Sequence, residues 1–260
     1  GVAEPFEVTL VRDKIQVQSV RSRVENNIGY IRITSFSGQT QSGLEKAIES
    51  IQDEAGEALL GYVLDLRNNP GGLLNQGVSV SDSFLEKGEI VSTRGRTTEN
   101  IQRFQATPGD LTNGMPIVVL INGGSASAAE IVAGALQDQH RAILLGTQTF
   151  GKGSVQTITP LSRNGSAIKL TTQRFYTPSG KSIQQLGITP DITVERARVE
   201  VIEATPQRSE KDLAGSLKNE VEGAVPTENV ATDTAIEDYQ LARALDLIRG
   251  IGLYRGQAAN

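Results

Sequence analysis

The feature that most constrains this chain is a run of small residues, 122–129, between an aliphatic stretch and a helical pattern. Residues 117–121 (Ile-Val-Val-Leu-Ile) are all aliphatic, which predicts a strand buried on both faces. Ile131, Ala135 and Leu136 then recur at helical spacing among alanines. The chain must therefore make a tight turn from a buried strand into a helix, and a serine lies at the start of that helix.

A serine in this position has two interpretations. The first N–H groups of a helix are unpaired, and the positive end of the helix dipole favours a developing oxyanion, so such a serine is well presented as a nucleophile. The alternative is an ordinary N-cap serine, which is the commoner use of the residue at a helix start. On this stretch alone the N-cap interpretation is favoured.

Composition removes several classes of protein. The 260 residues suffice for one large domain or a domain with appendages, and they include no cysteine, which excludes disulfides, thiol nucleophiles and thiolate metal sites. The net charge is −5 without a basic block, so we expect no nucleic-acid partner. No apolar run approaches the roughly 20 residues of a membrane helix, so we expect no transmembrane segment. The first residues, 1–5, are not those of a signal peptide.

Buried aliphatic strands alternate with helical patterns up to Gly146, which predicts an α/β domain. We expect strands at 29–34, 59–66, 90–92, 117–121 and 142–145, and helices at 43–55, 74–84 and after 127. Two short strands are expected within 5–18. Beyond Gly146 the period becomes two, which predicts strands around 155–158, 167–172 and 173–176, with a hairpin turn at Asn164-Gly165, and a short strand at 189–194.

The C-terminal quarter has a different character. Residues 197–235 are acidic, lack aromatic residues and show no sustained periodicity, so we interpret them as a tether or loosely ordered excursion. A final helix is expected at about 236–253, and we expect it to dock on another surface.

A serine nucleophile needs a base, and the choice of base is narrow. His140 is the only histidine, and it follows Ser127 by thirteen residues on the same expected helix. The two residues would therefore be roughly 20 Å apart along the helix axis, beyond hydrogen-bond reach. Asp138 would be about 16 Å from Ser127. Lys152 lies between two glycines after a buried strand, and a desolvated lysine can act as a neutral base. The alternative is a solvated loop lysine.

The segment 146–153 also matches the phosphate-binding pattern G-x-x-x-x-G-K-[ST] up to its last position. Gly153 stands where the hydroxyl residue belongs, and the residues that follow alternate like a strand although the motif requires a helix. We therefore reject nucleotide binding here.

Five segments together resemble the carboxyl-terminal processing peptidases, also called tail-specific proteases. They are VLDLRNNPGGLL (63–74), SASAAEI (125–131), TFGKGSVQ (149–156), FYTPSG (175–180) and GITPD (187–191). The resemblance covers about residues 20–196 in the family's order and spacing.

The resemblance assigns catalytic roles to three positions. Ser127, three residues before a glutamate, would be the nucleophile rather than Ser125. Lys152, 25 residues further on (152 − 127), would be the base. Gln156 would orient the lysine, and in a strand the period of two would bring both residues to one face.

The resemblance also implies supporting groups. The oxyanion hole would be the N–H of Ala128 with that of Gly72 or Gly71, Gly72 being preferred. The family's aspartate matches Asp138, which we interpret as structural support because of its distance from Ser127. Ala129 stands where the family often has serine, and we expect this difference not to affect the reaction.

The family implies a crotonase-like ββα protease core at 20–196, flanked by β-hairpins and a C-terminal helix, with no cofactor and no metal. Residues 1–19 resemble the end of a PDZ domain with its exit strand. Expected substrates are proteins with nonpolar C-terminal tails, and the expected location is the periplasm or cell envelope. Residues 236–260 are expected to form the C-terminal helix and a tail, and the helix is expected to serve a homo-oligomer or an adaptor contact. The alternative function is a catalytically silent, peptide-binding scaffold of the same fold.

Overall fold

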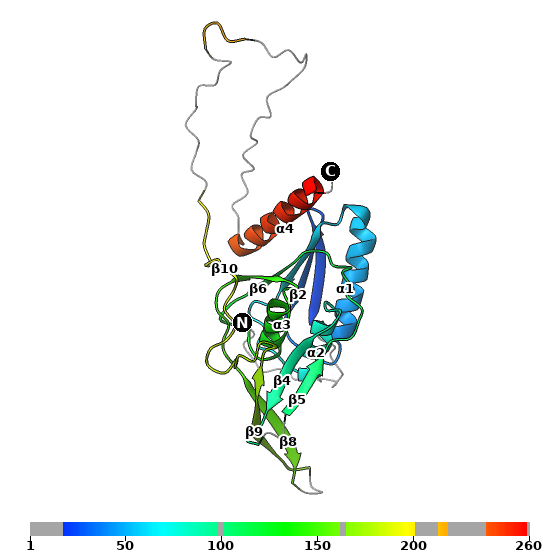
Figure 1. Cartoon of the computed structure of the whole chain (residues 1–260), viewed down its shortest axis with the longest axis vertical. Coiled ribbons are helices and arrows are strands. Elements are labelled where there is room, and N and C mark those ends of the chain that lie inside the picture. The colour runs from blue at the N-terminus through cyan, green and yellow to red at the C-terminus, as the bar shows by residue number, and fades with distance from the viewer. Residues whose placement is uncertain (1–17, 98–100, 162–164, 201–212, 218–237, 259–260) are drawn as a thin grey trace, which may run out of the picture.

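The computed structural model describes residues 18–97, 101–161, 165–200, 213–217 and 238–258. Two sheets organise this part of the chain (Figure 1). The larger sheet has six strands in the order β1-β2-β3-β6-β7-β10, and β2, β3, β6, β7 and β10 pair in parallel. The smaller sheet has four antiparallel strands in the order β5-β4-β9-β8.

The strands and helices are bounded as follows. The strands are β1 Val20–Glu25, β2 Ile28–Ile33, β3 Gly61–Asp65, β4 Glu89–Arg94, β5 Ile101–Gln105, β6 Ile117–Ile121, β7 Ile143–Gly146, β8 Ser154–Pro160, β9 Ala167–Tyr176 and β10 Ile192–Thr193. The α-helices are α1 Thr40–Ala55, α2 Leu74–Asp82, α3 Ala128–Asp138 and α4 Tyr239–Ala258, and a short 3-10 turn, Gly56–Ala58, follows α1.

The large sheet is covered on both faces, which explains its aliphatic strands. Alternate residues of β6 illustrate this: Val119 packs in the cluster formed with α1, α2 and α3, whereas Val118 and Leu120 pack with α4. The two apolar clusters therefore lie on opposite faces of one sheet. Helix α4 contributes Leu241, Ala244, Leu245 and Ile248 to the second cluster.

The predicted α/β fold is confirmed, with corrections at particular elements. Strands β1 and β5 were not expected; the first has exposed central residues and the second is mostly exposed, so neither has a buried aliphatic run. The two strands expected at 167–172 and 173–176 form one strand, β9. Helix α4 begins at Tyr239 rather than 236 and continues to Ala258.

Several predictions lie partly or wholly outside the described residues. These are the strands within 5–18, the end of a PDZ domain at 1–19, Asn164 of the hairpin turn, and most of the acidic segment 197–235. Among the described helices, none is long and apolar enough to cross a membrane.

Candidate active site

Ser127 sits at the junction of β6 and α3 in a strained conformation. Its backbone has φ 57° and ψ −114°, outside the regions that a serine ordinarily occupies, and its side chain is partly exposed. Such a conformation costs on the order of 1–3 kcal/mol and is found mainly where function requires it. Ser127 is the N-cap of α3 and forms a capping box with Glu130. Capping alone does not require a strained backbone, so the strain favours a presented nucleophile in addition.

Glu130 links the serine turn to the lysine segment. Its side chain is fully buried, and one carboxylate oxygen accepts the N–H groups of Ser127 and Lys152 at 2.8 and 2.9 Å. The other oxygen accepts the Thr149 hydroxyl and the Gly151 N–H, both at 2.6 Å. One carboxylate therefore fixes the backbone of Ser127 relative to that of Lys152.

This role of Glu130 was not predicted from the sequence. The signal was present as a carboxylate in an otherwise apolar helical stretch, since a buried charge must be paired or hydrogen-bonded. What the pattern could not show was the partner segment, because 149–152 is distant in sequence.

The turn 68–72 packs directly on the serine turn. A Cβ added at Gly71 would lie 2.7 Å from the Ser127 Cβ and 2.7 Å from the Ala126 carbonyl oxygen, so only glycine fits there. The Gly71 N–H is engaged, because it donates to Asn69 Oδ1 at 2.8 Å. Among the described residues, the N–H groups of Gly72 and Ala128 donate to no protein acceptor. Two unused backbone donors thus lie on adjoining turns.

Ser125 holds these turns together. Its hydroxyl is fully buried, donates to the Leu66 carbonyl at 2.8 Å and accepts the Asn122 N–H at 3.0 Å. The Asn122 side chain in turn accepts the Asn68 N–H at 2.9 Å. Ser125 is therefore a structural hydroxyl, in contrast to the partly exposed Ser127.

Lys152 and Gln156 are both exposed in this structure. Lys152 precedes β8, and the strand expected after Gly153 is present. Within the described residues, no hydrogen bond joins the Lys152 ammonium to the Ser127 hydroxyl. Gln156 pairs with Thr171 in the β8–β9 hairpin, where the register skips Thr172.

Asp138 lies at the other end of α3, away from Ser127. Burial alone would raise the pKa of its carboxyl, but hydrogen bonds from Thr177 and Ser179 lower it below the ordinary value. Its carboxylate accepts the Ser179 N–H at 2.9 Å and so contacts the 177–180 turn; its supporting role for the site stays a prediction. His140 is exposed just beyond the helix.

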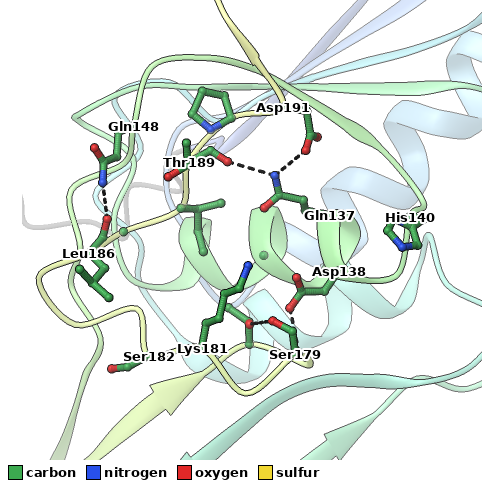
Figure 2. Close-up of a pocket in the computed structure, with 15 residues that line it drawn as sticks. Gln137, Asp138, His140, Gln148, Ser179, Lys181, Ser182, Leu186, Thr189 and Asp191 are labelled. Carbon is green, nitrogen blue, oxygen red and sulfur yellow. Dashed lines mark hydrogen bonds between the residues drawn. The ribbon is translucent and has the colours of Figure 1, made fainter.

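Asp138, Lys181 and His140 also line a cleft of about 770 Å³ at this end of the helix (Figure 2). Ser127 is not among the residues that line this cleft. In the part of the chain that is described, no three acidic or histidine side chains gather as metal ligands.

The fold is α/β, with a strained serine at the start of α3 and, on the adjoining turns, two backbone N–H groups that donate to no acceptor among the described residues. The chain belongs to Peptidase family S41, whose model matches residues 27–194.

Named relatives agree with this family. The chain is 53% identical over 255 residues to a carboxy-terminal-processing protease of Bartonella bacilliformis, covering 96% of this chain and 58% of that protein. It is 38% identical over 210 residues to a carboxyl-terminal-processing protease of Synechocystis, covering 79% and 48%. The chain thus spans about half the length of these relatives.

The same fold occurs in a solved structure of similar sequence. The photosystem II D1 C-terminal processing protease matches with a TM-score of 0.63 and 32% identity, over 71% of this chain and 50% of that chain.

Proposed function

We propose that this chain is the catalytic core of a serine peptidase that processes proteins at or near their C-terminal tails. The observation that carries the proposal is the strained Ser127 at the positive end of α3, together with the N–H groups of Gly72 and Ala128, which have no acceptor within the described parts of the chain. The names of the relatives support C-terminal processing as the reaction. A location in the periplasm or cell envelope is part of the proposal.

In the proposed mechanism the Ser127 hydroxyl attacks the scissile carbonyl while the neutral Lys152 amine accepts its proton. The N–H groups of Ala128 and Gly72 stabilise the oxyanion, and Gly72 is preferred over Gly71 because the Gly71 N–H is occupied. The Lys152 ammonium then donates the proton to the leaving amine, which gives an acyl-enzyme. Water hydrolyses the acyl-enzyme with Lys152 again as base, and Gln156 orients the lysine.

Lys152 must approach Ser127 for this mechanism to operate. Its ammonium is exposed here, whereas a lysine base has to be desolvated to become neutral near working pH. The Lys152 backbone is already fixed through Glu130, so rotation of the side chain with partial burial under bound peptide would complete the site.

The exposed lysine is also the observation that favours the second candidate, a catalytically silent peptide-binding scaffold of the same fold. A serine without a neighbouring base is weakly nucleophilic. The two functions differ in whether Ser127 reacts.

The test is labelling with a serine-reactive fluorophosphonate, together with hydrolysis of a peptide that has a nonpolar C-terminal tail. We expect the protein to be labelled at Ser127, and Ser127→Ala to lose both labelling and hydrolysis. Tight peptide binding without labelling or turnover would support the scaffold and overturn the peptidase proposal.

A further inference from the structure

The start of α4 completes the hydrogen bonding of a buried arginine that directly precedes the 68–72 turn. Arg67 is only 8% exposed, and each of its five guanidinium N–H donors has a partner. Two bonds go to Asp65, at 3.0 and 2.7 Å. The other three go to the beginning of α4: two to Asp238, at 2.8 and 2.7 Å, and one to Gln240, at 3.1 Å.

Asp238 also begins the helix. Its carboxylate accepts the Leu241 N–H at 3.1 Å, as an N-cap residue does. Burial alone would raise the pKa of this carboxyl, but the hydrogen bond from Arg67 lowers it. The same side chain thus caps α4 and attaches the helix to Arg67.

Arg67 lies between two points at which the active-site turns are tied together. The preceding carbonyl, that of Leu66, accepts the Ser125 hydroxyl, and the following N–H, that of Asn68, donates to Asn122. Asn68 has φ 56°, and the turn continues directly to Gly72. A shift of Arg67 is therefore transmitted to the 68–72 turn, because little flexible backbone separates them.

A bidentate arginine–carboxylate pair has directional as well as energetic consequences. With Asp65 alone, the buried guanidinium would keep two of its five bonds and could tilt about that carboxylate. Asp238 approaches from the other side, so the two carboxylates fix the plane of the guanidinium. The packing of Leu241, Ala244, Leu245 and Ile248 on the sheet holds α4, and with it Asp238, in place.

We propose that Asp238 is a positioning residue for the 68–72 turn, and that docking of the C-terminal helix thereby sets the position of the Gly72 N–H. This inference rests on the proposed function, in which that N–H stabilises the oxyanion. It makes α4 part of the catalytic apparatus without contact with substrate. Withdrawal of the start of α4 would therefore lower turnover.

The test compares Asp238→Asn and Asp238→Glu with Asp246→Asn. Asparagine caps a helix as well as aspartate does, so Asp238→Asn removes the charge and retains the cap. Asp246 pairs with Arg243 and Arg249 on the exposed surface of the same helix and serves as the matched control.

For Asp238→Asn we expect kcat and the rate of fluorophosphonate labelling to fall about tenfold or more, with KM within about twofold, because an oxyanion donor acts mainly in the transition state. Amide hydrogen exchange should accelerate in residues 66–73, and Asp238→Glu should restore part of both effects. Asp246→Asn should match the parent protein in every measurement.

Equal kcat and equal exchange at 66–73 in parent and Asp238→Asn would overturn the inference, as would an equal loss in Asp246→Asn. Circular dichroism at the assay temperature checks that α4 remains folded. If α4 melts in Asp238→Asn, kcat and exchange at 66–73 are compared between Asp238→Glu and the parent, and equal values in that pair would overturn the inference. Failure of the parent to be labelled or to hydrolyse peptide would instead reject the proposed function, while hydrogen exchange would still test the attachment of the turn to α4.

Discussion

At the scale of single residues, two serines two positions apart have different environments. Ser125 is buried with both hydrogen-bonding functions of its hydroxyl occupied, whereas Ser127 is partly exposed and strained. Their local sequences are nearly alike, so the backbone turn assigns the roles.

Replacement of each serine by alanine should separate these roles. We expect Ser127→Ala to lose hydrolysis by several orders of magnitude, with a loss of only about 0.5–2 kcal/mol in the free energy of unfolding because the hydroxyl is also part of the α3 capping box. Ser125→Ala should keep substantial activity but lose about 1–3 kcal/mol of stability, since it leaves the Asn122 N–H without its partner and the Leu66 carbonyl with the Asn69 N–H alone. Peptide hydrolysis and urea unfolding measure the two quantities, and normal turnover by Ser127→Ala would contradict the assignment.

Lys152 offers a second prediction at this scale. Lys152→Arg should be inactive, because a guanidinium cannot give up its proton. The control is His140→Gln, which should leave kcat unchanged because His140 is exposed beyond the far end of α3. Retained turnover in Lys152→Arg would rule out the lysine base.

At the scale of elements, helix α3 positions different groups at its two ends. Its N-terminus presents Ser127 and the Ala128 N–H, while its C-terminus holds the 177–180 turn through Asp138. Because the pKa of Asp138 is lowered by folding, its ionisation stabilises the folded state above the ordinary carboxyl pKa of about 4. That contribution is lost as the pH falls through the lower, folded-state pKa.

Asp138→Asn should therefore weaken the dependence of stability on acid pH. Between about pH 6 and pH 3, we expect the free energy of unfolding to fall less in the variant than in the parent, because the variant has no carboxylate to protonate at this site. Urea unfolding over this range provides the measurement. Parallel pH curves for the two proteins would show that the hydrogen bonds of Asp138 do not contribute.

At the scale of the whole molecule, a C-terminal element covers one face of the central sheet. Ile248 of α4 is fully buried against this face, although the helix is joined to the rest of the domain only through the last quarter of the sequence. The apolar strands β2, β3 and β6 need this cover, since each has buried residues on both faces.

Ile248→Ala should therefore destabilise the domain by about 2–5 kcal/mol, the usual cost of truncating a fully buried aliphatic side chain. Leu253→Ala, at a position 72% exposed on the same helix, should change stability by less than about 0.5 kcal/mol. Chemical unfolding of both variants measures the difference. Equal effects would show that α4 does not bury the sheet in solution.

Local patterns in the sequence determined the strand at 117–121, the turn of small residues and the helix after Ser127, because each signal lies within a few residues of the element that it specifies. They also indicated Ser127 and Lys152 as candidate site residues, and the family resemblance added Gln156; all three remain predictions. Only the tertiary structure revealed the four hydrogen bonds to Glu130 and the contact of Arg67 with Asp238, 171 residues away. Contacts between distant segments leave no periodicity in either segment, so folding alone decides which polar groups meet.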